Sequence, residues 1–290
     1  MTGTPLADDR RDGTAVYLYG VARDLDPTAL RGASGVAGTP VRGITAARLT
    51  ALVSTVRLDE YGEGALRANL EDLTWLESTA RAHHAVVAHA AHTAPTAPVR
   101  IATIYRDDTR VAEVLTTQGT RFDDVLDRIT GRTEWGVKAY TTPGPGTGPE
   151  DTGGGLAPNA EPPTGPNPAP TPDPAPGAGA AYLRRRRRER DTREDAARRD
   201  AERAADVHAE LADHAVASRH HSPQDPRLSG RPGVQILNAA YLLDDDQTAG
   251  FLAVTRTAGE RLPGVDLEVT GPWPPYSFID PVDSTEPQDR

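Results

Sequence analysis

A stretch rich in proline and glycine, from Pro143 to Gly179, limits what this chain can fold into. Twelve prolines and nine glycines occupy 21 of its 37 positions. Because such a segment cannot bury enough apolar surface to offset its backbone entropy, we predict a disordered linker over residues 142–180. The linker separates an N-terminal domain at 15–141 from a C-terminal domain at 181–280. A disordered leader at 1–14 and a tail at 281–290 complete the predicted organisation.

Length and composition agree with two small domains and exclude several classes of protein. The 290 residues suffice for two cores, and the hydrophobic content of 37% is low enough to indicate that part of the chain has none. The chain has no cysteine, so it forms no disulfide and no thiolate metal site, as is typical of the reducing cytosol. Its first residues are polar, and no apolar run approaches the ~20 residues of a membrane helix. A formal charge of −10 argues against general affinity for nucleic acid.

The N-terminal domain is predicted to be α+β with a largely antiparallel sheet. Helical spacing from Glu63 to about Ala91, with a break near Leu70–Leu73, places Leu73, Leu76, Ala80, His83, Val87 and Ala90 on one stripe facing a core. His83 is therefore expected to point inward. Strands are predicted at Val16–Val21, Leu49–Val56, Val99–Tyr105 and Glu134–Tyr140, the last of which closes this domain.

The C-terminal domain begins with a long helix that is rich in arginine. Arg184 to Arg188 are consecutive, and acid-before-base pairs such as Glu189–Arg193 and Glu194–Arg198 support a helix. Its apolar face continues through Val207 and Leu211. A strand at Val234–Leu243, a helix and a strand at Leu267 then follow, which predicts a smaller α+β unit of modified ferredoxin-like character.

The segment from Leu267 to Ile279 is the most distinctive passage of the sequence. After a short alternating strand, Trp273, Tyr276 and Phe278 are held among three prolines, in a segment that suits neither a helix nor a central strand. Two interpretations stand side by side. The aromatics form a clasp over the core of the second domain, or they form a rigid surface that binds a partner.

No pattern in the sequence indicates catalysis, a cofactor or a metal. Among His83, His84, His89 and His92, only the last pair has a spacing that suits a helical metal site, and no carboxylate cluster accompanies it. Asp107 and Asp108 are better explained as helix-capping residues than as an acid/base pair. We therefore predict no enzyme activity, no cofactor and no metal site.

The arginines at 184–188 have three interpretations. The first is a solvated helix face, which the acidic residues that follow them in the same helix favour. The second is a phosphate-binding site. The third is a basic patch that binds an acidic partner or neighbouring assembly components. With Trp273, Tyr276 and Phe278, these arginines are the candidate partner-binding residues: Arg184, Arg185, Arg186, Arg187 and Arg188.

Several passages taken together resemble the gas vesicle protein GvpF/GvpL family. They occur in order across both domains, at Val16–Val21, Ala80–Val87, Pro98–Asp108, Glu134–Tyr140, Tyr182–Arg190, Leu237–Leu243 and Thr270–Phe278. The pairing of Glu-Trp-Gly-Val-Lys with Gly-Pro-Trp-Pro-Pro-Tyr-Ser-Phe is the specific part. The long linker and the polar leader depart from the family pattern.

The resemblance implies a cytoplasmic accessory or minor structural protein of gas vesicle formation. Such a protein would bind the small hydrophobic shell protein and other accessory proteins, and it would have two α+β domains. We expect no membrane and no nucleic acid among its partners. The rival hypothesis is a protein that binds nucleic acid or an anionic surface through the arginine-rich helix, with an affinity that falls steeply with salt.

Overall fold

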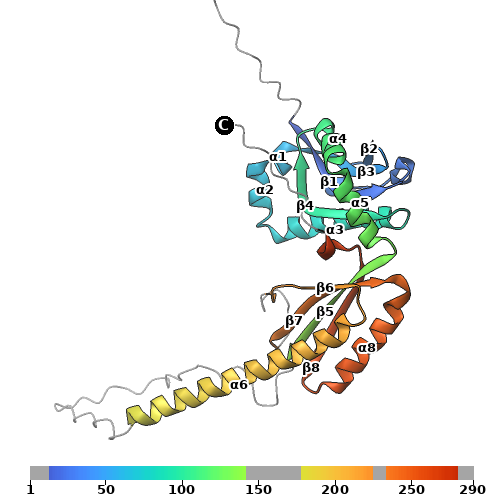
Figure 1. The fold of residues 1–290 in the computed structure, drawn as a ribbon. Coiled ribbons are helices and arrows are strands. Elements are labelled where there is room, and N and C mark those ends of the chain that lie inside the picture. Colours follow the sequence, from blue (N-terminus) through green and yellow to red (C-terminus); the bar gives the residue numbers. More distant parts are fainter. Residues whose placement is uncertain (1–12, 142–177, 225–232, 280–290) are drawn as a thin grey trace, which may run out of the picture.

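The computed structural model describes residues 13–141, 178–224 and 233–279. The described residues form two units, each built on a four-stranded antiparallel sheet, and the first part of one long helix projects beyond the second unit (Figure 1). The predicted α+β class with antiparallel sheets is therefore confirmed. Most of the predicted linker, residues 142–177, lies outside the described residues, as do most of the predicted leader and the tail.

The first sheet has the strand order β2-β3-β1-β4. Its strands are β1 (Thr14–Arg23), β2 (Arg42–Ala46), β3 (Leu49–Arg57) and β4 (Thr96–Tyr105). The central strand β1 is buried almost throughout, because both faces of the sheet are covered by helices. It therefore reads as a nearly continuous apolar run and not as an alternating one.

Helices cover the two faces of the first sheet separately. On one face α1 (Leu58–Tyr61) and α3 (Leu73–Ala91) pack, and α2 (Glu63–Asn69) links them. On the other face lie α4 (Asp108–Thr117) and α5 (Gly119–Ile129). The predicted break falls between α2 and α3, where the Asp72 carboxylate caps the new helix. His83 is buried as predicted, but Leu73 is 66% exposed and does not belong to the buried stripe.

The second sheet has the order β6-β7-β5-β8, and it corrects one prediction. Strand β5 (Arg132–Thr141) pairs with β7 (Gln235–Asp244) and β8 (Val265–Trp273), and not with a strand of the first sheet. The expectation that Glu134–Tyr140 closes the N-terminal domain is therefore wrong. The strand lies in the middle of the second sheet, because its exposed hydrogen-bonding groups find partners on both sides there.

Two helices pack on one face of the second sheet. They are α6 (Ala178–Ala212) and α8 (Thr248–Arg261), and their buried side chains meet those of β5 and β7. The short edge strand β6 (Ala217–His220) was not predicted, since its sequence Ala-Ser-Arg-His is mostly polar and exposed. None of the helices in the described ranges is long and apolar enough to cross a membrane.

Candidate interaction surfaces

The residues after β8 hold the two units together. Trp273, the last residue of β8, and the residues after it to Ile279 are here called the clasp; they form an extended proline-rich piece and a tight turn at Tyr276–Phe278. This turn lies between the two units, as its red colour shows in Figure 1. Prolines at 274 and 275 fix two backbone φ angles and offer no N–H, so the segment cannot extend the sheet. It lies instead against both units.

Each residue of the clasp has its own contacts. Tyr276 packs on α3, with its ring centroid 6.1 Å from that of His83 and 6.3 Å from that of His84. Phe278 is only 6% exposed and packs against Ala240 and Leu242 of the second sheet. Ile279 packs against the core under α4 and α5. The clasp therefore joins the first unit to the second through apolar contacts on both sides.

A buried carboxylate anchors the turn of the clasp. The Glu134 Oε2 atom accepts a hydrogen bond from the Ser277 backbone N–H, and Oε1 accepts one from the Ser277 hydroxyl, both at 2.7 Å. Glu134 is 8% exposed, and burial raises the pKa of its carboxyl group while the two hydrogen bonds oppose that rise. Trp135 points to the opposite face of β5, as the alternation of the sequence predicts.

We expect Ser277→Ala to lower the free energy of unfolding by about 1–2 kcal/mol, because a buried carboxylate loses one of two charged hydrogen bonds. The pKa of Glu134 should rise further in this variant. Urea denaturation at pH 7 measures the first effect. Asn69→Ala removes a half-buried side chain that also makes one hydrogen bond, but in α2. If both variants lose the same stability, the anchor has no special role.

Beneath the clasp, the first unit contains a buried polar pair. The Tyr17 hydroxyl lies 3.0 Å from Nδ1 of His83 and accepts a hydrogen bond from the Ala102 backbone N–H at 3.0 Å. Burial lowers the pKa of His83 from 6.5 to about 4, so this imidazole is neutral at neutral pH. His83 thus packs in the core and is not available as a metal ligand at the surface.

A groove of about 500 Å³ runs along the junction of the units, and we call it the seam groove. Its walls come from the end of α3, from the connection between α5 and β5, and from the start of the clasp. The Trp273 side chain is 41% exposed there, and its ring packs edge-on against His84 at 5.2 Å. The groove is lined mainly by small or apolar side chains, among them Ala88, Ala91, Ile129, Pro272 and Pro274.

The predicted aromatic surface is thus divided between two roles. Phe278 is buried and Tyr276 is largely covered, so both contribute to the clasp. Of the three aromatics, Trp273 alone presents a large exposed surface, and it does so in the seam groove. Sequence reasoning missed the groove residues from α3, such as Ala88 and Ala91, because nothing local marks them as neighbours of Trp273.

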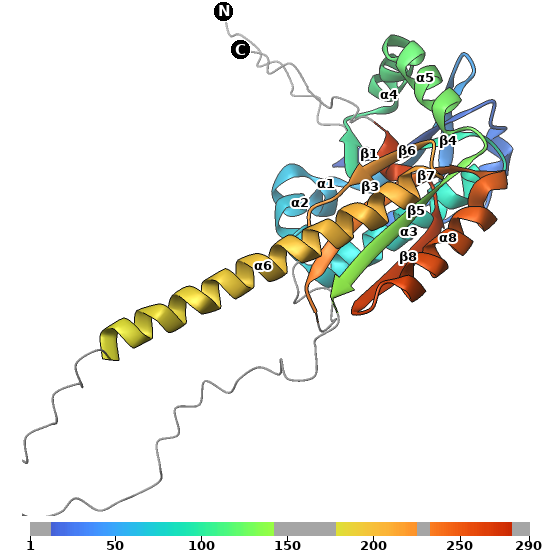
Figure 2. The same cartoon turned by 60° about the horizontal axis from the view of Figure 1, so that its bottom comes forward.

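The arginines of α6 lie apart from the clasp. Arg184 to Arg188 are all exposed, on a part of α6 that projects from the body of the molecule (Figure 2). Arg185 pairs with Glu189 and Arg190 with Glu194, each with the base first in sequence. Glu194 was predicted to pair with Arg198, but Arg198 pairs with Asp195 instead. The structure does not bring these arginines together with the predicted aromatics.

The remaining candidates make contacts that stabilise the fold. The Asp107 carboxylate caps α4 by accepting a hydrogen bond from the Arg110 N–H, as predicted. Rings of His89 and His92 contact the backbone carbonyls of Ala29 and Ala88. Within the described ranges, no group of three or more His, Cys, Asp or Glu residues is placed to hold a metal ion.

A family model and a named protein both match most of this chain. The model of a family described as "Gas vesicle synthesis protein GvpL/GvpF" matches residues 15–280. A protein named "Gas vesicle protein L" from Streptomyces sp. (strain CB03234) is 39% identical over 262 residues, which cover 90% of this chain and 91% of that protein.

Two solved structures share the fold. The gas vesicle protein GvpF from Anabaena sp. PCC7120 matches with a TM-score of 0.61 at 16% identity, over 92% of this chain and 96% of that one. GvpF from Microcystis aeruginosa matches with a TM-score of 0.58 at 16% identity, over 92% and 99% respectively. At these identities the likeness concerns the fold of both units.

Proposed function

Because the chain belongs to the GvpL/GvpF family of gas vesicle synthesis proteins, we propose that it is a non-enzymatic assembly or minor structural protein of gas vesicles. In this role it binds the hydrophobic shell protein, and other accessory proteins, while the vesicle forms. It acts in the cytoplasm and at the gas vesicle. The observation that carries the proposal is the exposed Trp273 in the apolar seam groove.

The seam groove suits an apolar segment for physical reasons. Trp273 is held between Pro272 and Pro274 and rests on His84, so little side-chain freedom remains to be lost on binding. Tryptophan is enriched among the residues that contribute most to protein interfaces. Ala88 and Ala91 leave room beside it for apolar side chains of a shell subunit. The acidic charge of −10 would keep the complex in solution.

We also infer a ferredoxin-like second unit. Its chain order is strand, helix, strand, strand, helix, strand, from β5 through α6, β6, β7 and α8 to β8. The strand order β8-β5-β7-β6 places the first and third of these strands side by side in the middle. This connectivity supports the prediction of a modified ferredoxin-like domain, with an unusually long first helix.

Replacing Trp273 with alanine should weaken binding of the shell protein by about 30-fold, the loss expected for a central tryptophan in an interface. The measurement is quantitative co-purification of the shell protein with tagged chain from cells that express the whole gas vesicle gene cluster. Leu73→Ala is the matched control, because Leu73 is exposed but lies outside the groove. Equal retention by Trp273→Ala and the wild type would contradict the seam groove as the site.

The wider proposal has its own test. A strain that lacks this chain should form few or defective gas vesicles, and the wild-type chain should restore them. If the deletion leaves the vesicles normal and the tagged chain retains no shell protein, the assembly role is wrong. If the chain retains shell protein but Trp273→Ala does so equally well, only the placement of the site is wrong.

A further inference from the structure

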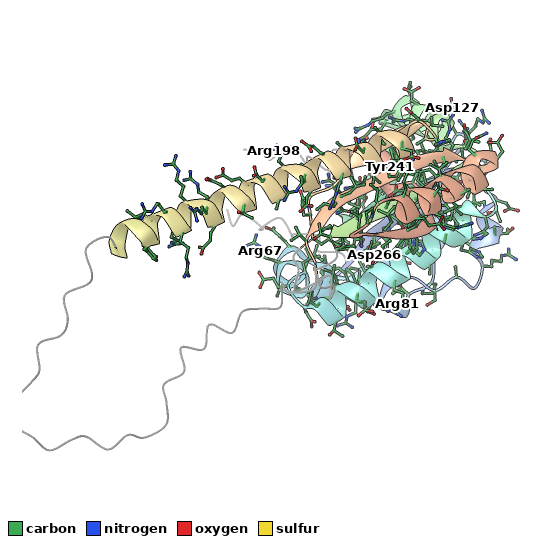
Figure 3. The ribbon with its side chains drawn as sticks, turned by 90° about the horizontal axis from the view of Figure 1, so that it is seen from below. Arg67, Arg81, Asp127, Arg198, Tyr241 and Asp266 are labelled. Carbon is green, nitrogen blue, oxygen red and sulfur yellow. The ribbon has the colours of Figure 1, made fainter. Side chains whose placement is uncertain are left out.

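The first part of α6 stands free of the rest of the described chain. Its core contacts begin at Ala204 and continue with Val207 and Leu211, while the described side chains from Tyr182 to Asp195 are exposed except for a half-buried Glu189. We call residues 182–195 the arm. Figure 3 shows it projecting beyond Arg198, with its side chains in solvent. At 1.5 Å per residue these residues extend about 20 Å.

The part of α6 that follows the arm is packed against the second sheet, so the arm has a defined direction. Val207 is 1% exposed and Leu211 is fully buried. Nδ1 of His208 lies 2.9 Å from the hydroxyl of the buried Tyr241 of β7, and Arg261 of α8 forms an ion pair with Glu210. A partner that meets the arm therefore meets a surface fixed relative to the second sheet.

The charges of the arm are unfavourable in the isolated chain. Five consecutive arginines place five positive charges within about 7 Å along the helix axis. Like charges at i,i+4, such as Arg184 and Arg188, also repel. Within the described part of the chain, no carboxylate lies within 4.0 Å of Arg184, Arg187 or Arg188. An anionic partner would relieve this repulsion in a chain that otherwise carries net negative charge.

Apolar side chains lie beside the arginines and indicate the kind of partner. Tyr182 is 57% exposed and Leu183 is 67% exposed. Arginine together with exposed aromatic and aliphatic side chains is typical of protein interfaces. The purely cationic part extends only about 7 Å, and Glu189, Asp191 and Glu194 follow it, so a phosphate backbone laid along the arm would soon meet carboxylates.

We propose that the arm binds an acidic segment of a partner protein, with carboxylates facing Arg184, Arg187 and Arg188 and an apolar side chain against Leu183, four positions that share one face of the helix. The surface is separate from the seam groove, and its partner is recognised by charge and not by apolar burial alone. A second contact of this kind would let the chain connect an apolar subunit to an acidic assembly protein. Its test does not depend on binding of the shell protein.

The test uses the full chain and a fluorescein-labelled helical peptide with about five glutamates on one face and a leucine at one end. The dissociation constant should rise about tenfold or more when Arg184 to Arg188 are all replaced by glutamine, since several exposed ion pairs are lost. Leu183→Ser should weaken binding about threefold or more through lost apolar contact. A peptide with glutamines in place of the glutamates should not bind.

The helix itself offers a matched control. Replacing the other five arginines of α6 by glutamine removes the same charge: Arg190, Arg193, Arg198, Arg199 and Arg203. This variant should lose less than about threefold in affinity, because Arg198, Arg199 and Arg203 lie beyond the arm and Arg190 already pairs with Glu194. Circular dichroism of both variants checks that the helix is retained, as glutamine and arginine have similar helix propensity.

Several outcomes would overturn the proposal. One is a peptide that does not bind the wild type, and another is a control variant that loses as much affinity as the Arg184–Arg188 variant. A third is an RNA oligonucleotide or a phosphatidylserine vesicle that binds more tightly than the peptide at about 0.15 M salt and is unaffected by Leu183→Ser. That result would identify the arm as a site for phosphates.

Discussion

Replacing Phe278 with alanine is expected to lower the free energy of unfolding by about 3 kcal/mol, the low end for a buried Phe→Ala change. Phe278 is 6% exposed and fills the space over Ala240 and Leu242 on the face of the second sheet that α6 and α8 leave uncovered. Its apolar partners include Ala217 and Ala240, whose short side chains cannot fill the cavity that the substitution leaves. Urea denaturation at pH 7 measures the loss.

The same variant tests whether the clasp joins the units. Tyr276 lies two residues away and packs on α3, so loosening the turn should also increase hydrogen exchange in α3 of the first unit. Leu73→Ala, at an exposed position in the same helix, should leave exchange and stability nearly unchanged. A loss below about 1 kcal/mol, the typical effect of any substitution, would show that the clasp contributes little.

Lowering the pH from 6.5 to about 4 should cost the wild type about 3 kcal/mol through His83 alone. The folded pKa of His83 is about 4, against 6.5 without burial, and each unit of difference corresponds to about 1.4 kcal/mol. Because the folded pKa is the lower one, the unfolded chain binds more protons in this window. The contribution of the neutral imidazole is full above pH 6.5, declines as the pH falls, and levels off below about pH 4.

His83→Gln isolates this effect, because glutamine stays neutral and every other group titrates in both proteins. The variant should be less stable than the wild type at pH 7, where it loses the packing between Tyr17 and Tyr276. Toward pH 4 the difference should shrink by about 3 kcal/mol. A constant difference between the two urea midpoints from pH 7 to pH 4.5 would mean that His83 does not titrate as the burial requires.

Local patterns predicted several elements correctly because local physics determines them. The 3.6-residue spacing placed His83, Val87 and Ala90 on the buried side of α3. Asp107 predicted the start of α4, since a carboxylate before the first turn satisfies free N–H groups. The family resemblance, carried by Glu134–Tyr140 and Thr270–Phe278, is confirmed by the match over residues 15–280.

The sequence led to a wrong prediction of strand pairing for β5. The β5 strand follows α5 after two residues, which suggested that it belongs to the first unit, yet its partners β7 and β8 begin about 100 and about 130 residues later. Proximity in sequence does not decide pairing, because the apolar face formed by Trp135, Val137 and Ala139 can be buried against either unit. The clasp explains why the two most specific passages of the family resemblance occur together in this chain. Glu134 of the first passage accepts hydrogen bonds from Ser277 of the second.

The candidate site was predicted only in part, because it too depends on contacts between residues far apart in the sequence. Three aromatics among prolines indicated a rigid segment, but its position between the units decides which of them is exposed. Tyr276 and Phe278 face the two units, and Trp273 is left at the seam groove. For Arg184–Arg188, the composition of the segment predicted both a helix and the exposure of its side chains. That this part of the helix projects from the body depends on where the second sheet ends, which composition does not reveal.

Hydrogen–deuterium exchange of the full chain with and without bound shell protein tests the central claim most directly. We expect protection at the end of α3, at residues 130–133 and at the amide of Trp273, the one backbone N–H among residues 272–275; all three segments line the seam groove. The first part of α6 should exchange at the same rate in both samples. Protection that appears elsewhere and leaves these three segments unchanged would contradict the assignment of the seam groove as the binding site.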